Sequence, residues 1–308
     1  MSGRVVYTGN VIVDIGLAIG AMPEPGGDVI ASSSQITAGG GFNAMTAAAR
    51  DGAPVLYAGQ YGTGPFGSIV REALHGFAVA GPGLSDLDSG YSIVLVDDSA
   101  ERTFVTYVGA EGQLRLADLR RAAIADDDVV VVSGYGLAHP VNAEALTAWL
   151  PGLPEAVRVV LDPSPLVADL PPGVLGAALA RTDVLSANAR ETRLLTPALA
   201  DAPLADRAAA LRPRLRPGGT VIARDNSEGA WIADEQGVRL VPGFQVNAVD
   251  TTGAGDAHTG VLAAALLRAD PIDTAVRRAN AAAALAVTKR GPATAPEAAE
   301  TDRLLNAR

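Results

Sequence analysis

The chain has 308 residues, of which 48% are hydrophobic and 19% charged, and its formal net charge is −10. This balance predicts a folded protein with one large domain, or one domain with a smaller appendage, rather than a disordered chain. The acidic excess disfavours nucleic acid and anionic membrane as partners, and the lack of cysteine excludes disulfides, thiolate nucleophiles and cysteine-based zinc sites.

No signal peptide is visible, because Met1 to Arg4 run directly into a strand-like segment. No apolar run approaches the ~20 residues that span a bilayer, so we expect a cytoplasmic protein. His75, His139 and His258 are far apart in the sequence and do not have the spacing of metal ligands.

Short β-branched runs alternate with alanine-rich helical runs along most of the chain. The predicted strands lie near residues 5–7, 55–57, 129–132, 157–161, 184–185 and 221–223. The predicted helices lie near 42–50, 67–75, 117–124, 142–150, 173–180, 189–196, 204–211, 256–268, 272–288 and 297–307. Continuously apolar strands separated by helices indicate a parallel sheet that is covered on both faces.

Two segments interrupt this alternation. Residues 11–36 contain prolines and glycines without a helical period, and residues 90–108 contain two alternating strands around the turn at 97–101, which predicts a hairpin. We expect both segments to form a small sheet that stands off the main body as a lid.

The motif with the most chemical content is Asp250-Thr251-Thr252-Gly253-Ala254-Gly255-Asp256, which precedes a helical run. Backbone amides in such a turn, together with the start of a helix, form an anion site suited to a phosphoryl group. Asp256 would then accept a proton from an attacking hydroxyl. The simpler alternative is a glycine turn into a helix, with Asp256 as a partner of the helix dipole.

Three other motifs have both a structural and a functional interpretation. Gly39-Gly40-Gly41-Phe42-Asn43 would let the backbone approach a ligand closely, and Asn43 could hydrogen-bond to a hydroxyl. The alternative is a flexible turn with Asn43 in the first turn of the helix. Asn188 and Glu191 are spaced to hold hydrated magnesium or to cap a helix. The pattern Gly62 to Gly67 fits a glycine turn better than a dinucleotide site, because Pro65 removes an amide.

There is no Walker A sequence, and the only lysine is Lys289, so phosphate chemistry would need a fold without a P-loop. The set of motifs resembles the ribokinase-like, or PfkB, family of carbohydrate kinases over nearly the whole chain. The matching segments are Gly9-Asn10 with Asp14, residues 39–43, 61–67, 162–165, 188–191 and 250–256, Asn280, and residues 287–291.

The resemblance implies one kinase domain over 1–308 with a three-layer α/β/α fold, a central, largely parallel sheet and a β lid from about 11–36 and 90–108. It implies ATP and Mg²⁺, with Asp256 as the base and Gly253, Ala254 and Gly255 as the anion hole. Sugar contacts would come from Asp14, Gly40, Gly41 and Asn43. ATP contacts would come from Asn188, the stretch Arg224 to Gly229 with Ser227, and Asn280.

The resemblance also implies that Glu191 organises Mg²⁺ through water. A monovalent-cation loop, for which K⁺ is the candidate, would use Asp250, Thr252, Ala286, Lys289, Gly291 and Ala295, mostly through carbonyls. Three residues depart from the family pattern. His258 replaces the usual phenylalanine, Ala295 lacks a hydroxyl for the cation, and Ile12 replaces an asparagine of ribokinases, so ribose is not the expected substrate.

The sequence therefore predicts an ATP-dependent kinase of a small sugar or sugar-like substrate. A nucleoside kinase is an alternative if Phe42, Tyr91, Phe104 or Tyr107 forms an aromatic slot. A sugar-phosphate kinase would need a basic group near the sugar, for which Arg102 is the candidate. A non-catalytic sensor is disfavoured by Asp256 and its intact glycine turn. An exposed lid sheet often pairs with a second copy in this family, so a homodimer is a further hypothesis.

Overall fold

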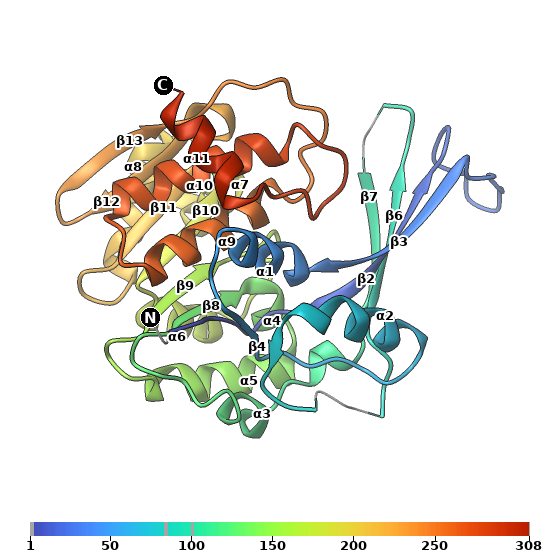
Figure 1. The fold of residues 1–308 in the computed structure, drawn as a ribbon, viewed down its shortest axis with the longest axis horizontal. Helices are drawn as coiled ribbons and strands as arrows, with labels where there is room; N and C mark the ends of the chain where they lie inside the picture. The colour runs from blue at the N-terminus through green and yellow to red at the C-terminus, as the bar shows by residue number, and fades with distance from the viewer. Residues whose placement is uncertain (1–2, 83–85, 100–101, 308) are drawn as a thin grey trace.

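The computed structural model describes residues 3–82, 86–99 and 102–307, and elements are numbered as in Figure 1. The strands are β1 (Val5–Tyr7), β2 (Val11–Ala18), β3 (Ser33–Gly40), β4 (Val55–Tyr57), β5 (Ala78–Val79), β6 (Tyr91–Val96), β7 (Arg102–Tyr107), β8 (Val129–Ser133), β9 (Arg158–Asp162), β10 (Val184–Asn188), β11 (Thr220–Arg224), β12 (Gly229–Asp234) and β13 (Gly237–Pro242). The α-helices are α1 (Gly41–Arg50), α2 (Pro65–Ala73), α3 (Leu116–Arg120), α4 (Gly134–Ala138), α5 (Pro140–Trp149), α6 (Pro172–Arg181), α7 (Ala189–Leu195), α8 (Leu204–Leu211), α9 (Ala254–Leu267), α10 (Ile272–Ala286) and α11 (Ala298–Asn306).

The central sheet has the strand order β13-β12-β11-β10-β9-β8-β1-β4-β5. Its strands from β11 to β5 pair in parallel, whereas β12 and β13 add an antiparallel edge. The inner strands are buried on both faces, as β8 shows with five buried residues in succession. This explains why their sequences are continuously apolar instead of alternating.

Helices cover both faces of this sheet and form two cores (Figure 1). On one face, Tyr7 of β1 belongs to a cluster with Met45 of α1 and Val261 of α9. On the other face, Val6 of the same strand belongs to a cluster with Leu146 of α5 and residues of α6 and α8. The three layers and the central, mostly parallel sheet agree with the predicted fold class.

A separate four-stranded sheet, with the order β3-β2-β6-β7, projects from the main body (Figure 1). Residues paired across neighbouring strands share a face, and successive residues of a strand point to opposite faces. One cross-strand row is polar and consists of Thr37, Asp14, Ser92 and Thr106. The next row is apolar and consists of Ile36, Ile15, Ile93 and Val105. The small sheet therefore has a polar side at the first row and an apolar side at the second.

Several element bounds differ from the sequence prediction. Strand β3 continues to Gly40, so two glycines expected in a turn belong to the small sheet. Helix α3 ends at Arg120, and Ala123 then has a positive φ of 45°, which continued helix does not allow. The pair β12 and β13 was not predicted. In the predicted hairpin turn, Ala100 and Glu101 lie outside the described residues.

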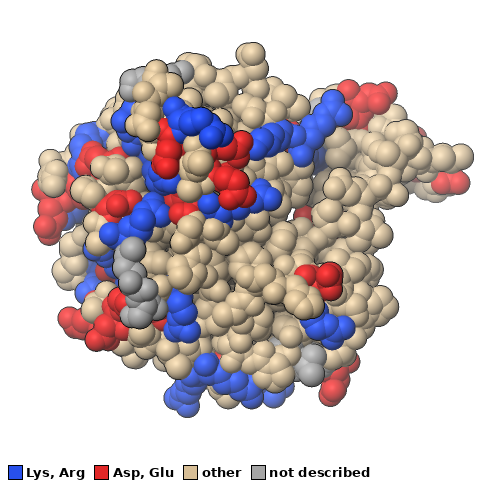
Figure 2. All heavy atoms as spheres, viewed as in Figure 1, with Lys and Arg blue, Asp and Glu red and all other residues tan. Residues whose placement is uncertain are grey.

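Charged groups of both signs are intermixed on the face seen in Figure 2, and the projecting sheet is mostly uncharged there. None of the helices in the described ranges is both long and apolar enough to cross a membrane.

Candidate active site

The turn before α9 places Asp256 in the first turn of that helix. Gly253 has a left-handed φ of +75°, and a Cβ at this position would lie 2.0 Å from the carbonyl oxygen of Pro292. Only glycine fits such a position without strain. The turn therefore fixes where α9 begins, and with it the position of the Asp256 carboxylate.

Backbone amides at the start of α9 are free to bind an anion. Within the described ranges, the amides of Gly253, Gly255 and Asp256 have no hydrogen-bond acceptor, and the amide of Ala254 makes only a long bond of 3.3 Å to the Thr251 carbonyl. Unpaired amides at a helix N-terminus carry the positive end of the helix dipole. Such a group of amides is suited to phosphoryl oxygens.

Asp256 has the ionisation behaviour of a general base. Burial raises its pKa to about 7, opposed by a hydrogen bond from Asn43 and by the charge of Arg224, and supported by the carboxylates of Asp162 and Asp14. The hydrogen bond runs from Asn43 Nδ2 to Asp256 Oδ2 at 3.1 Å. A carboxylate with a pKa close to neutral accepts a proton more readily than an ordinary aspartate does.

Asn43 and Asp14 form the side of the site nearest the small sheet. Asn43 Oδ1 is buried and has no hydrogen-bond partner in the described structure, so it is free to accept a bond from a ligand. Burial raises the pKa of Asp14, on β2, to about 6. A Cβ on Gly39 would lie 1.9 Å from Asp14 Oδ2, so glycine at this position makes room for the carboxylate. Gly40, at a φ of +61°, then turns the chain from β3 into α1, which Gly41 begins.

Arg224, at the end of β11, joins the start of α9 to two carboxylates. Its Nη1 donates to the Gly255 carbonyl at 3.1 Å and to Thr259 Oγ1 at 3.3 Å. Its Nη2 lies 3.5 Å from Asp162 Oδ2 and 3.4 Å from Glu191 Oε2. Burial and the charge of Asp162 raise the pKa of Glu191, although Arg224 opposes them. Arg224 and Asp162 end β11 and β9, and Glu191 lies three residues after the end of β10, so these three groups lie at the carboxyl ends of parallel strands, where open α/β sheets bind ligands.

Asn188 and Glu191 also form the helix cap that the sequence offered as the simpler alternative. The Asn188 amide donates to Glu191 Oε2, and the Glu191 amide donates to Asn188 Oδ1, both at 2.8 Å. Glu191 Oε2 accepts the hydrogen bond of the cap and also contacts Arg224, so Glu191 caps the helix and takes part in the site at the same time.

A cavity of about 590 Å³ opens beside the start of α9. Of the residues predicted to surround ATP, it is lined by Asn188, Arg224, Asn226, Ser227, Gly229 and Asn280, whereas Asp225 and Glu228 of the predicted stretch are not part of the lining. Ala254 and Gly255 of the glycine turn also line it, and Phe244, Val246, Ala284 and Val287 contribute apolar lining. A cavity with apolar walls and a few convergent polar groups is typical of a small-molecule site.

His258 also lines this cavity, in the position where the sequence departs from the family pattern. The side chain is 3% exposed, and neither ring nitrogen has a partner of normal hydrogen-bond geometry among the described residues. Burial and the charge of Arg224 lower its pKa to about 3, against a contact with Asn280 that favours protonation. The imidazole is therefore neutral at physiological pH.

Of the residues predicted to form a cation loop, Thr252 and Gly291 contact Asp250. The Thr252 amide donates to Asp250 Oδ1 at 2.9 Å, and the Gly291 amide donates to Oδ2 at 3.0 Å. Burial opposes ionisation of Asp250, but these amides and the charge of Arg102 outweigh it and lower its pKa. Lys289 points elsewhere, with Nζ 3.5 Å from Glu300.

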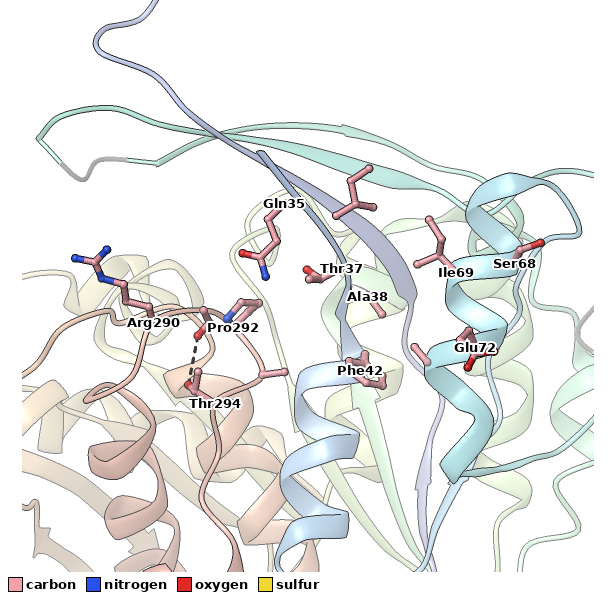
Figure 3. A pocket seen from close by; sticks show the side chains of 14 residues that line it. Gln35, Thr37, Ala38, Phe42, Ser68, Ile69, Glu72, Arg290, Pro292 and Thr294 are labelled. Carbon is pink, nitrogen blue, oxygen red and sulfur yellow. Dashed lines mark hydrogen bonds between the residues drawn. The ribbon is translucent and has the colours of Figure 1, made fainter. Parts of the chain in front are cut away.

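A second cavity, of about 710 Å³, lies between α2, the end of β3 and the loop at 290–294 (Figure 3). Phe42 and Ile69 contribute apolar walls, and Pro292 lines it from the loop. Because the Pro292 carbonyl faces Gly253, this cavity borders the segment that supports the turn before α9.

The glycine pattern at 62–67 forms a turn into α2, in agreement with the prediction. The amides of Phe66 and Gly67 donate to the carboxylate of Asp88 at 3.1 and 2.7 Å. The start of α2 is thus bound by a side chain of the protein rather than left open for a phosphate.

Three residues of the site escaped the sequence analysis as individual candidates. Asp162 was quoted only within a motif, although it ends a buried strand, and that position was a usable signal. Thr259 donates to Asp162 Oδ2 at 3.2 Å. Burial raises the pKa of Tyr135, in α4, and the carboxylates of Asp256 and Asp162 raise it further. The influence of these two carboxylates indicates that Tyr135 lies near the site.

Comparisons with known proteins place the chain in a sugar-phosphorylating class of enzymes. The pfkB family carbohydrate kinase model matches residues 4–299. The chain is 30% identical to an uncharacterized sugar kinase, YegV, of Escherichia coli, with 95% of this chain and 91% of the relative covered. It is 30% identical to the ribokinase of Haemophilus influenzae, with 94% of each covered.

Solved structures show the same fold. The ribokinase of Thermotoga maritima superposes with a TM-score of 0.83 at 21% identity, covering 98% of this chain and 99% of the other. The Arabidopsis thaliana ribokinase complexed with ribose and ATP gives a TM-score of 0.78 at 22% identity, covering 99% of each chain. The chain belongs to the pfkB family of carbohydrate kinases, as its sequence motifs predicted.

Proposed function

We propose that this carbohydrate kinase transfers the γ-phosphoryl group of ATP to a hydroxyl of an unphosphorylated sugar. The observation that carries the proposal is the position of Asp256. Its carboxylate has a pKa of about 7, accepts a hydrogen bond from Asn43, and stands beside the unpaired amides that begin α9. Ala254 and Gly255 of this turn line the 590 Å³ cavity, and the charge of Asp14 acts on Asp256.

In this proposal Asp256 accepts the proton of the sugar hydroxyl as the hydroxyl oxygen attacks the γ-phosphorus. The bond between the γ-phosphorus and the bridging oxygen breaks, and ADP leaves with that oxygen. The amides of Gly253, Gly255 and Asp256, with the dipole of α9, stabilise the charge on the transferring group. The Ala254 amide makes a long hydrogen bond to the Thr251 carbonyl, so Ala254 helps to hold the shape of the turn and does not itself bind the phosphoryl group.

ATP is assigned to the 590 Å³ cavity, with its phosphates toward Gly255 and its base toward the wall formed by Phe244, Ala284 and Val287. The donor set near the phosphates suits Mg²⁺, which usually keeps several waters and needs only one or two carboxylates. Glu191 and Asp162 are the carboxylates that would hold it. When bound, the ion would neutralise phosphate charge. ATP as the donor also fits the expected cytoplasmic location.

The sugar is assigned to the space between Asp256 and the polar row of the small sheet. Asp14 and Asn43 offer oxygens that accept bonds from hydroxyls. Gly40 and Gly41 are the other proposed sugar contacts, and the lack of a Cβ on Gly41 also makes room for the ring of Tyr7. Ile12, two residues before Asp14 on the same face of β2, offers no hydrogen bond. Arg102 is bound to Asp250, so it is not free to hold a sugar phosphate. The small sheet would act as a lid that excludes water from ATP.

A nucleoside kinase remains the second candidate because of Phe104. The other three aromatic candidates are packed on neighbours: Phe42 against Phe77, and Tyr91 against Phe66 and Tyr107. Phe104 is 56% exposed and is two residues from Thr106 on the polar side of the lid, where it has room to stack on a base.

The lid is also the proposed surface of a homodimer. Its apolar row contains Ile36 and Val105, which are 56% and 59% exposed, and Tyr107 on the same side is 60% exposed. A second copy that covers this row would remove apolar surface from water and protect the sheet.

The test is ADP release from Mg-ATP against ribose, 2-deoxyribose, hexoses, ribose 1-phosphate and nucleosides. We expect turnover with a free sugar, together with a product that carries a new phosphate ester. Turnover with nucleosides alone would establish the second candidate. ATP binding without turnover on any compound of the panel would contradict the proposed kinase and favour a sensor.

A further inference from the structure

Several oxygens of the predicted cation loop, the Asp250 carboxylate among them, are already bound by donors of the protein itself. Asp250 accepts three hydrogen bonds: from the Thr252 amide and Arg102 Nη2 to Oδ1, at 2.9 and 2.5 Å, and from the Gly291 amide to Oδ2 at 3.0 Å. Arg102 comes from β7 of the lid, 148 residues away in the sequence. The carboxylate that would anchor a cation is thus paired with a guanidinium.

The carbonyl oxygens of the loop are engaged in the same way. Thr294 Oγ1 lies 3.0 Å from the Ala286 carbonyl oxygen and 3.3 Å from that of Gly291, the second contact being drawn in Figure 3. Arg50 Nη1, from the last turn of α1, donates to the carbonyls of Ala293 and Ala295 at 3.0 and 2.7 Å. Ala295 has no hydroxyl to offer a cation, and its backbone carbonyl oxygen is bound by the guanidinium of Arg50.

The remaining oxygens do not make a cation site. Of the predicted set, the backbone carbonyls of Asp250, Thr252 and Lys289 and the buried Thr252 hydroxyl have no hydrogen-bond donor among the described residues. The only carboxylate beside them is that of Asp250, and the charge of Arg102 already offsets its charge. The guanidinium groups of Arg102 and Arg50 also repel another positive charge. Hence the loop of this chain does not fit K⁺.

The Arg102–Asp250 pair is more than a surface contact. The side chains are 25% and 14% exposed, so water screens the pair less than it screens an exposed ion pair. Asp250 is linked through the Thr252 amide to the segment that continues into Gly253 and Asp256. A lid movement that withdraws Arg102 would leave Asp250 without its positive partner.

We propose that Arg102 replaces the monovalent cation at Asp250, so that the enzyme works without K⁺ and lid closure itself supplies the positive charge beneath the phosphoryl-transfer turn. Arg102 is then a positioning residue that acts through Asp250. The predicted effect of Arg102 on catalysis rests on the proposed kinase function. The inference that the loop binds no cation is independent of that function.

The first test compares the wild-type protein in potassium, sodium and choline chloride at equal ionic strength. We expect thermal midpoints that agree within about 1 °C, because a ligand that does not bind cannot shift unfolding. Thallium(I) binding, followed by ²⁰⁵Tl NMR, should show no saturable site. A potassium-specific rise in the midpoint, or saturable thallium binding, would overturn the proposal even if no substrate were known.

The second test uses Arg102→Gln, with Arg290→Gln as a matched control, because Arg290 is an exposed arginine of the adjacent loop. Wild type and Arg290→Gln should turn over at rates that differ less than about twofold between potassium and choline, a difference well below 1.4 kcal/mol in the barrier. Arg102→Gln should lose at least about tenfold in kcat/KM in choline, and Arg102→Lys should lose less. Potassium should restore part of the Arg102→Gln loss.

Two results would contradict the role of Arg102. One is a wild-type rate that rises about tenfold or more with potassium. The other is an Arg102→Gln variant that keeps the wild-type rate and stability in choline. If no compound of the panel is phosphorylated, the proposed function fails, while the thermal and thallium measurements still decide whether the loop binds a cation.

Discussion

Asn43 Nδ2 donates a 3.1 Å hydrogen bond to Asp256 Oδ2 across 213 residues of sequence. The bond joins the glycine segment at the end of the small sheet to the turn that begins α9. Asn43 Oδ1 remains free on the same side chain. One side-chain amide therefore orients the proposed base and leaves an acceptor free for a substrate, so the proposed sugar and phosphoryl sites would be coupled through Asn43.

Asp256→Asn should lower kcat by about 10²–10⁴-fold, the usual contribution of a positioned general base. The amide keeps the shape of the carboxylate but cannot accept the proton. ADP release with the best sugar measures the effect, and the affinity for ATP, measured by calorimetry, should stay close to wild type. A variant that retains most of its activity would mean that another group is the base.

The same substitution should stabilise the protein at pH 8. The pKa of Asp256 is about 7 when folded and 3.8 ordinarily, so the folded state binds the proton more tightly, and stability falls as pH rises from about 4 to 7. Asn removes this loss, which we expect to be worth about 1–3 kcal/mol at pH 8, because partial solvent access of the site reduces the full effect. Urea unfolding at pH 5 and pH 8 should show the difference growing with pH.

The pH profile of kcat/KM should rise through a midpoint near 7, because activity needs the ionised form of Asp256. Asn43→Ala removes a hydrogen bond that favours the ionised form, so the midpoint should move up by about 1 unit. Rates from pH 5 to 9 with a constant-ionic-strength buffer measure this. A midpoint that stays in place in Asn43→Ala would disconnect the profile from Asp256.

Much of the fold was predictable because buried parallel strands have an unmistakable composition. The run Val129 to Val132 is apolar throughout, and only a strand covered on both faces tolerates that pattern. The antiparallel edge at Gly229–Asp234 and Gly237–Pro242 was missed. Glycines, prolines and charged residues dilute its alternation, and its stability comes from pairing with β11.

The sequence allowed a site to be proposed only where the chemistry is local in sequence. The turn at Gly253 and the residue Asp256 lie within one short motif, so an anion-binding turn and a general base could be proposed together from their spacing. Arg224 bridges Gly255, Asp162 and Glu191, which are far apart in the chain, and no periodicity places these groups together. For the same reason the contact of Arg102 with Asp250 could not be anticipated from the sequence of the lid.

Gly253→Ala should destabilise the protein and abolish turnover. A Cβ would meet the Pro292 carbonyl at 2.0 Å with φ at +75°, and such strain costs about 1–3 kcal/mol if the turn holds. Gly176→Ala in α6 is the matched control, because nothing lies within 4 Å of its Cβ and alanine favours helix by up to about 1 kcal/mol. Equal stability of the two variants would show that the turn does not need glycine.

Val105→Asp should convert a dimer to a monomer, if the apolar row of the lid is the interface. A buried carboxylate there would lack a partner, which is costly in an apolar contact. Val238→Asp on β13 is the control, as Val238 is 42% exposed and lies outside the lid. Sedimentation velocity over a range of concentrations distinguishes the states. Wild-type protein that stays monomeric at high concentration would remove the dimer from the proposal.

His258→Phe separates two groups that an activity profile near pH 7 would otherwise confuse. An ordinary histidine titrates near 6.5, close to the value for Asp256, but burial and Arg224 lower the pKa of His258 to about 3. The variant should therefore keep the wild-type midpoint of kcat/KM. It should also gain about 1 kcal/mol of stability, because it removes a buried polar ring without normal hydrogen bonds. Loss of the ionisation near pH 7 in this variant, with Asn43→Ala unchanged, would assign the profile to His258 and not to Asp256.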